Sequence, residues 1–145
     1  MITIITEMTD SEIFKTYWVP LICKYREIKF IFGNAGQLKR PVMNDWSNAA
    51  FGTKPLDLLV EHAKTDIVYI TKQNEIPTYE LMVCLMKPQE GIIPKIRKLT
   101  PAGSVDTNED SSSFTISKVN FPQTKNYKIR DLFYANSIDV TTYVI

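Results

Sequence analysis

The stretch from Asp66 to Lys87 constrains the fold of this chain more than any other segment. Its pattern predicts a β-hairpin, with one arm over residues 66–72, a turn over 73–77 and a second arm over 78–87. An extended second arm would place Tyr79, Leu81, Val83 and Leu85 on one face and Glu80, Met82, Cys84 and Met86 on the other. Because both faces are largely apolar, we expect a central strand that is covered on both sides.

Short elements of both kinds are expected around this hairpin. Runs of β-branched and aromatic residues predict strands over 2–6, 29–32, 91–99, 114–121 and 140–145. Apolar residues at helical spacing and capping signals predict helices over 11–18, 44–51 and 55–64. A break is expected at Val19, because Pro20 disfavours helical geometry in the residue before it. The predicted fold class is therefore α+β, with a mixed or antiparallel sheet and two to three helices, mainly in the N-terminal half.

Size and composition predict one compact domain. The chain has 145 residues, of which 44% are hydrophobic and 23% are charged. These values are ordinary for a single globular domain, so we expect one domain over residues 1–145. Residues 103–113 are mostly small and polar, which predicts a mobile polar loop.

The N-terminus and the cysteines bear on the cellular compartment. Residues 1–7 lack a basic start and a continuous apolar run, so they do not form a signal peptide. No apolar run approaches the roughly 18 residues that would span a bilayer, so a cytoplasmic location without a membrane partner is expected. Cys23 and Cys84 form no CxxC pair and lie in apolar runs. They are predicted to be buried free thiols, with one long-range disulfide as the alternative.

Motifs for catalysis are missing from the sequence. His62 is the only histidine, and a surface or capping role near a helix end suits it better than a Ser-His or Cys-His dyad. Asp66, Glu80 and Lys87 loosely allow the acidic pair and lysine of a nuclease-like hairpin, although a solvated polar edge is favoured. We therefore predict no catalytic residue, no metal ligand and no cofactor, and an enzyme is the less favoured class.

Nucleic-acid binding is a defined alternative. The segment from Gly33 to Gly36 has the GxxG spacing of a KH loop, but Pro41 would disrupt the helix that should follow, so a plain turn is favoured. Candidate nucleic-acid-binding residues form two basic clusters, which are Lys24, Arg26, Lys29, Lys39 and Arg40, and then Lys95, Arg97 and Lys98. Stacking surfaces could come from Tyr25, Phe30, Phe32, Phe114 and Phe121. The net charge of +1 gives no general attraction to nucleic acid, so such binding depends on these clusters.

The C-terminal third points to protein contacts. The chain ends in Tyr143, Val144 and Ile145, and leaving such side chains in water forfeits about 1.5–3 kcal/mol each. We expect this segment to pair within the sheet, or alternatively with another chain by strand addition. Phe133 and Tyr134 mark a second candidate interface.

The leading hypothesis is a non-enzymatic protein-binding or assembly protein that acts through an apolar interface. The candidate interface residues are Phe133, Tyr134, Tyr143, Val144 and Ile145. The partner would be another protein or a second copy of the chain. A small accessory or structural protein of a virus or phage fits this profile, and its location would then be the cytoplasm or the virion. A nucleic-acid-binding domain is the first alternative, and a small carboxylate- or metal-dependent enzyme is the second.

Overall fold

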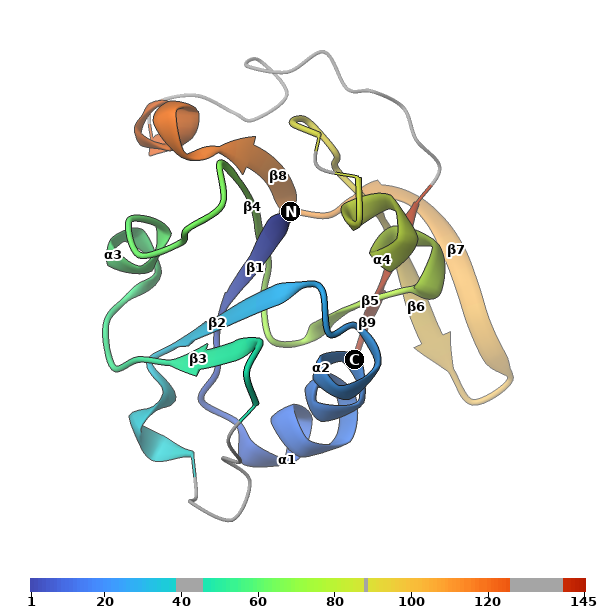
Figure 1. Cartoon of the computed structure of the whole chain (residues 1–145). Coiled ribbons are helices and arrows are strands. Elements are labelled where there is room, and N and C mark those ends of the chain that lie inside the picture. The colour runs from blue at the N-terminus through green and yellow to red at the C-terminus, as the bar shows by residue number, and fades with distance from the viewer. Residues whose placement is uncertain (39–45, 88, 126–139) are drawn as a thin grey trace.

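Two β-sheets organise the chain (Figure 1), and the computed structural model describes residues 1–38, 46–87, 89–125 and 140–145. Over these residues the first sheet has the strand order β3-β2-β1-β4-β8 and the second has the order β5-β9-β6-β7. The strands of the first sheet are β1 (Ile2–Glu7), β2 (Lys29–Gly33), β3 (Ala49–Phe51), β4 (Ile67–Ile70) and β8 (Phe114–Ser117). The strands of the second sheet are β5 (Glu75–Pro77), β6 (Lys95–Thr100), β7 (Gly103–Asp110) and β9 (Thr141–Val144).

The helices are short and lie mainly in the N-terminal half. They are α1 (Ser11–Ile13), α2 (Val19–Lys24), α3 (Leu56–Val60) and α4 (Tyr79–Leu85), with a π-helical segment over Phe14–Trp18 and 3₁₀ turns over Ala35–Gln37 and Lys118–Lys125. Together with the mixed sheets, they form a single compact α+β domain, so the predicted fold class is confirmed.

The first sheet is parallel except at one edge. Strand β1 pairs in parallel with both β2 and β4, and β2 pairs in parallel with β3. Strand β8 closes the sheet antiparallel to β4. From β1 the chain adds β2 and then β3 on one side of β1, and it then crosses to the other side of β1 to add β4. The direction in which strands are added therefore reverses between β1 and β4. The carboxyl ends of these two strands therefore meet at one edge of the sheet.

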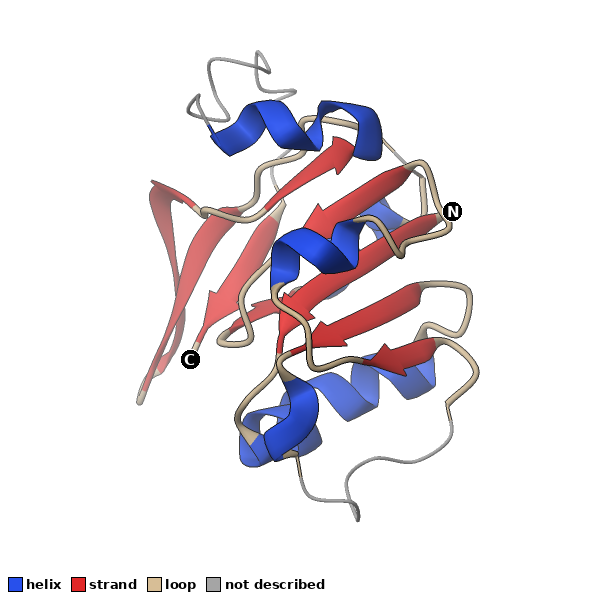
Figure 2. Ribbon diagram, turned by 90° about the vertical axis from the view of Figure 1, so that its left-hand side faces the viewer, coloured by secondary structure: helices blue, strands red, loops and turns tan. Residues whose placement is uncertain are grey.

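Helices cover both faces of this first sheet (Figure 2). Ile4 of β1 belongs to a core cluster with Phe14 and Trp18, whereas the next residue, Ile5, belongs to a second cluster with Leu59 of α3. Successive side chains of a strand point to opposite faces, so one β-branched run supplies both clusters. This is the arrangement expected for a parallel sheet buried on both sides.

The predicted hairpin over residues 66–87 is wrong in its second arm. Residues 66–72 supply β4, but the segment that follows β5 is the helix α4. The hydroxyl of Thr78 accepts a hydrogen bond from the backbone N–H of Leu81 and caps this helix. Leu81, Met82 and Leu85 are buried while Val83 and Met86 are exposed, which is helical spacing. An apolar run with few polar residues fits both the two-residue period of a strand and the 3.6-residue period of a helix. In this segment the helical period is the one observed.

Four smaller predictions also differ from the structure. No break occurs at Val19, because the N–H of Val19 bonds to the carbonyl of Phe14 in the π-helical segment and Pro20 lies in the first turn of α2. The described part of the predicted helix over 44–51 contains strand β3 instead, and the predicted helix over 55–64 is reduced to α3. The predicted polar loop over 103–113 is mostly strand β7, whose partner β6 supplies its hydrogen bonds.

The second sheet is completed by the C-terminus of the chain. Strand β9 lies between β5, with which it is antiparallel, and β6, with which it is parallel. Tyr143 is opposite Ile76 on one side and Arg97 on the other. The prediction that the C-terminal segment pairs within the sheet is therefore confirmed.

Candidate functional site

A crevice lies where the winding of the first sheet reverses. Its walls come from the end of β1, from the segment that follows β4 and from the start of α3, and its volume is about 440 Å³. The residues that line it are Thr6, Glu7, Leu56, Thr71, Lys72, Gln73 and Asn74. In open α/β sheets, ligands bind outside the carboxyl ends of the strands at this point of reversal. The volume is within the usual range for small-molecule sites.

The Gln73 side chain joins the two walls of the crevice. Its Oε1 accepts hydrogen bonds from the backbone N–H groups of Thr9 at 3.0 Å and Asp10 at 3.1 Å. Its Nε2 donates to the Thr9 hydroxyl at 3.0 Å. The Gln73 carbonyl accepts from the indole N–H of Trp18 at 2.9 Å. Three of these bonds hold the segment after β4 against the loop after β1, and the fourth holds it against the π-helical segment, so the crevice is preformed.

A buried polar cluster supports the crevice from beneath. The Glu75 carboxylate is 4% exposed and accepts hydrogen bonds from the hydroxyls of Ser111 at 2.5 Å and Ser113 at 3.0 Å. The Ser113 hydroxyl also lies 2.8 Å from that of Thr71, which lines the crevice. Burial raises the pKa of Tyr69 in the same region, so its hydroxyl stays protonated. The cluster thereby fixes the crevice wall to the segment that leads into β8.

The crevice carries one charge of each sign. Among its lining residues, Glu7 and Lys72 are the charged side chains, and both are exposed to solvent. An ammonium group can bind a phosphate as a point charge, and a carboxylate can accept hydrogen bonds from sugar hydroxyls. Within the described ranges, no group of three or more His, Cys, Asp or Glu side chains is placed to hold a metal ion.

The structure places the described nucleic-acid candidates on different elements, with Lys24 in α2, Lys29 in β2 and the second cluster in β6. Lys24, Arg26 and Lys29 are exposed, whereas Lys39 and Arg40 lie outside the described residues. In the second cluster, Lys95 pairs with Asp110 at 2.6 Å and Arg97 pairs with Asp106 at 2.5 Å. Hydrogen bonding to Asp106 raises the pKa of Arg97, so the guanidinium stays charged. Lys98 is exposed and lies between these two pairs and the β6–β7 turn.

The predicted stacking surfaces are wrong, because the aromatic rings are in the core. The residues Tyr25, Phe30, Phe32, Phe114 and Phe121 are all 9% exposed or less. Phe32 packs edge-on against both Phe14 and Trp18, with ring centroids 5.2 and 5.9 Å apart. Such rings contribute to folding and have no face available to a base.

The remaining predicted residues are dispersed over the molecule. Tyr143 and Val144 are half-buried on β9 and Ile145 is exposed, while Phe133 and Tyr134 lie outside the described residues. The structure places His62 on the surface after α3. The predicted nuclease-like arrangement of Asp66, Glu80 and Lys87 is wrong, because helix α4 replaces the second arm of the hairpin that would have carried it. Cys23 and Cys84 are free thiols, but they are exposed and half-buried rather than buried.

Sequence reasoning missed the crevice. Its signal was available, because Glu7 directly follows the predicted strand over 2–6, and Lys72 and Gln73 come one residue after the end of β4. Polar residues after two parallel strands meet at one edge of the sheet. The hairpin prediction hid this relation, since it paired residues 66–72 with residues 78–87 instead of with β1.

Comparisons with known proteins place the chain by its fold. No protein-family model matches it, and no curated protein matches it in sequence. TarS residues 1–349 from S. aureus match 99% of this chain with a TM-score of 0.59 at 9% identity. A protein named as a glucose-1-phosphate thymidylyltransferase from Bacillus anthracis, solved in complex with sucrose, matches 100% with a TM-score of 0.50 at 9% identity. The chain spans 60% of the TarS structure and 87% of the Bacillus anthracis protein.

Among the described helices, none combines the length and the apolar character that a membrane crossing needs.

Proposed function

We propose that this chain is a binding domain that holds a phosphorylated sugar or a nucleotide in the crevice between the ends of β1 and β4. The observation that carries the proposal is the preformed cavity of about 440 Å³ at the point where the winding of the sheet reverses. A site of this size accommodates a ligand of roughly the size of a nucleotide.

The lining residues suit the parts of such a ligand. The Lys72 ammonium is exposed at the crevice and attracts a phosphate group. The Glu7 carboxylate accepts hydrogen bonds from ribose or hexose hydroxyls. Leu56 supplies apolar surface for the face of a ring. The fold likeness to a protein named as a glucose-1-phosphate thymidylyltransferase agrees with this ligand class as an analogy at the level of the fold.

Calorimetric titration tests the proposal. We expect UDP-glucose, thymidine diphosphate or glucose 1-phosphate to bind saturably, and Lys72→Ala to weaken the binding about tenfold or more through loss of a charge-assisted contact. Lys98→Ala removes the same charge from an exposed position outside the crevice and should leave the affinity unchanged. Absence of saturable binding by all three compounds, or equal weakening by both variants, would refute the proposal.

Protein binding, the leading hypothesis from the sequence, is a second proposal for a different surface. Three large side chains that line one groove are exposed to water, namely Tyr79 at 62%, Leu99 at 48% and Ile145 at 36%. Exposed apolar side chains gathered in one place are typical of an interaction surface.

A further inference from the structure

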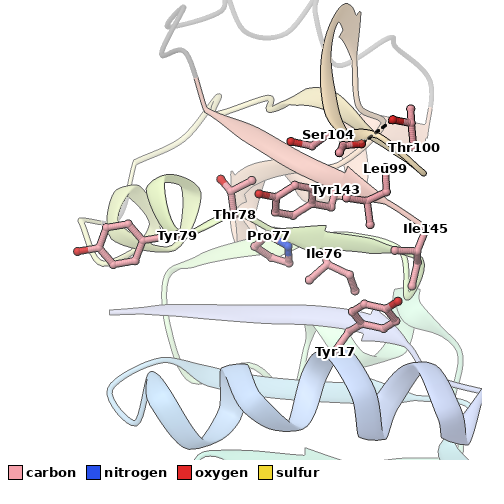
Figure 3. A pocket seen from close by; sticks show the side chains of 11 residues that line it. Tyr17, Ile76, Pro77, Thr78, Tyr79, Leu99, Thr100, Ser104, Tyr143 and Ile145 are labelled. Atoms are coloured by element: carbon pink, nitrogen blue, oxygen red, sulfur yellow. Dashed lines mark hydrogen bonds between the residues drawn. The ribbon is translucent and has the colours of Figure 1, made fainter.

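A pocket with a volume of about 310 Å³ lies at the amino-terminal ends of the parallel strands, whereas the crevice lies at their carboxyl ends. Its walls come from the starts of β1, β2 and β3 and from the connection between α3 and β4. It shares no lining residue with the crevice, nor with the groove that Tyr17 and Tyr143 line between the π-helical segment and the second sheet (Figure 3). The pocket is therefore a separate surface from both.

Strand pairing fixes the walls of this pocket. Lys29, the first residue of β2, is paired with Thr3 of β1. The Thr3 hydroxyl lies 2.7 Å from the hydroxyl of Thr65, which donates to the carbonyl of Ile67 at 2.9 Å. Because Thr65 gives its hydrogen to Ile67, Thr3 is the donor to Thr65. These bonds hold the connection between α3 and β4 against β1, on the strand next to Lys29.

The charged side chains of the described lining are all basic. They are Lys29, His62 and Lys64, and all three are exposed to solvent. No ion pair joins any of them to a residue in the described ranges. The two ammonium groups are therefore available to a ligand, together with an N–H of the imidazole.

The surrounding charges do not neutralise this pocket. The Lys118 ammonium donates to the carbonyls of Glu61 and Ala63, which adds a positive charge beside the connection between α3 and β4. The acidic residues that flank the basic ones in sequence are Glu27, Glu61 and Asp66, and all are exposed and outside the described lining. Positive charges gathered in a concave site attract an anion. A phosphate monoester carries about −1.5 to −2 at pH 7, whereas a carboxylate carries a single charge.

Asn48 adds a buried polar wall. This residue lines the pocket and is 2% exposed. Its Nδ2 donates to the carbonyls of Ile22, Tyr25 and Ile28 at 3.0, 3.2 and 3.3 Å, so its Oδ1 is the acceptor that remains. That oxygen has no hydrogen-bond partner among the described residues. Buried acceptors normally have a donor, and a ligand hydroxyl would supply one at this wall.

We propose that this pocket binds a small sugar phosphate, whose phosphate is held by Lys29, Lys64 and the imidazole of His62. The inference is independent of ligand binding in the crevice. Lysine binds a phosphate as a point charge, and a sugar hydroxyl donates to the Asn48 Oδ1. A volume of about 310 Å³ is at the lower end of the range for small-molecule sites, which suits a monosaccharide phosphate better than an extended polymer.

Proton NMR of the imidazole tests the inference at this pocket alone, because His62 is the only histidine of the chain. We expect ribose 5-phosphate to shift the ring C–H signals saturably. Lys29→Ala and Lys64→Ala should each weaken the affinity about tenfold or more, because each removes a charge-assisted contact. Both side chains are exposed, so thermal unfolding of the two variants should match that of the parent chain.

Lys98→Ala and Lys72→Ala are the matched controls. The first removes an exposed lysine elsewhere on the surface, and the second removes the lysine of the crevice. Neither should change the affinity read from the His62 signals. Failure of the crevice proposal would leave this titration intact, and failure of the present inference would leave calorimetric binding in the crevice intact.

Comparisons between ligands decide the chemical class. Ribose should give no saturable shift, because it has no phosphate for the lysines to bind. Inorganic phosphate should bind about tenfold more weakly than ribose 5-phosphate, because it lacks the sugar that reaches Asn48. Raising the ionic strength from about 0.01 to about 0.15 M shortens the screening length from about 30 to about 8 Å, so the affinity should fall severalfold.

Any of four results would overturn the inference. These are no saturable shift with ribose 5-phosphate, equal binding of ribose or inorganic phosphate, binding that Lys29→Ala and Lys64→Ala leave intact, and tighter binding of a single-stranded thymidine decanucleotide through the same lysines. The last result would assign the pocket to nucleic acid.

Discussion

The two sheets of this protein bury their strands to very different extents. Strand β1 of the first sheet has five buried residues followed by the exposed Glu7, whereas β7 of the second sheet is exposed at most positions. The first sheet has helices on both faces, and the second sheet has an open edge at β7 and one face at the groove. The difference teaches that the first sheet supplies most of the core, whereas the second supplies exposed surface.

The sheets are nevertheless joined by the segment from Thr71 to Tyr79. Its first part lines the crevice of the first sheet, and its last part lines the groove of the second. The N–H of Ile145, in the groove, donates to the carbonyl of Asn74, in the crevice, at 3.0 Å. Changes in one sheet that spread to the other should therefore pass through this segment.

Removal of residues 141–145 should have the largest effect. Strand β9 pairs with strands on both sides and contains Thr142, which is fully buried. We expect the truncated chain to lose cooperative thermal unfolding, because β5 would lose its strand partner and β6 would lose one of its two. Circular dichroism during heating measures this. A variant in which the five residues are replaced by Gly and Ser keeps the chain length and should be equally affected; an unchanged midpoint in either variant would contradict the prediction.

Trp18→Ala should have the next largest effect and should sharpen the contrast between the sheets. The Trp18 ring is fully buried against Phe32 of the first sheet, so its removal should lower the free energy of unfolding by about 3–5 kcal/mol. Val105→Ala in β7 is the control, because Val105 is 53% exposed and should cost no more than about 0.5 kcal/mol. Urea titration measures both values, and equal losses would show that the division between the sheets is wrong.

Glu75→Gln tests the connection between the sheets. The substitution removes the charge that two serine hydroxyls bond to and should lower the free energy of unfolding by about 1–3 kcal/mol. Glu109→Gln, at an exposed position of β7, should be nearly neutral. If the cluster positions Thr71 in the crevice, Glu75→Gln should also weaken nucleotide binding. A loss of stability without any change in nucleotide affinity would assign the cluster to folding alone.

Glu90 should give the smallest effect and a defined pH dependence. Burial favours its neutral form, but hydrogen bonds from Ser117 and Asn120 outweigh burial, so the pKa of Glu90 is lowered. A lowered pKa in the folded state contributes stability above the pKa of the unfolded chain and loses it as the pH falls through the folded value.

The Glu90 contribution is therefore present at neutral pH and absent in strong acid. Glu90→Gln should cost at most about 1 kcal/mol at neutral pH, because the carboxyl is partly exposed and screened by water. The difference from the parent chain should shrink as the solution is acidified, and thermal unfolding across a pH series measures it. Glu61→Gln, an exposed position after α3, is the control. A difference that grows towards acid would contradict the assigned direction.

Several elements were predictable because local signals determined them. The β-branched run over 2–6, the aromatic run over 29–32 and the capping signal of the predicted helix over 11–18 correspond to β1, β2 and the N-cap of α1 at Asp10. The terminal apolar segment was correctly predicted to pair within a sheet. The free energy of burying its large apolar side chains favours pairing over exposure to water. In each of these cases, propensity and burial point to the same answer.

The errors arose where two local readings fit the same residues. The run over 78–87 has apolar residues at both strand and helix spacing, and the choice of a strand concealed the ends of β1 and β4 as a site. Residues 103–110 have little apolar character and form a strand only because β6 pairs with them. The aromatic residues chosen as stacking surfaces were assigned to the core by the packing of Phe32 against Phe14 and Trp18.

The sequence by itself determined the α+β class, the apolar runs that would be buried and the absence of familiar catalytic motifs, because each of these depends on composition or on neighbours within a few residues. Only the tertiary structure decided which strands are parallel, and hence that Glu7 and Lys72 share a crevice and that Tyr17 faces Tyr143 across a groove. The physical reason is that parallel pairing joins residues separated by a whole crossover, and local sequence carries no record of which strand a distant segment will meet.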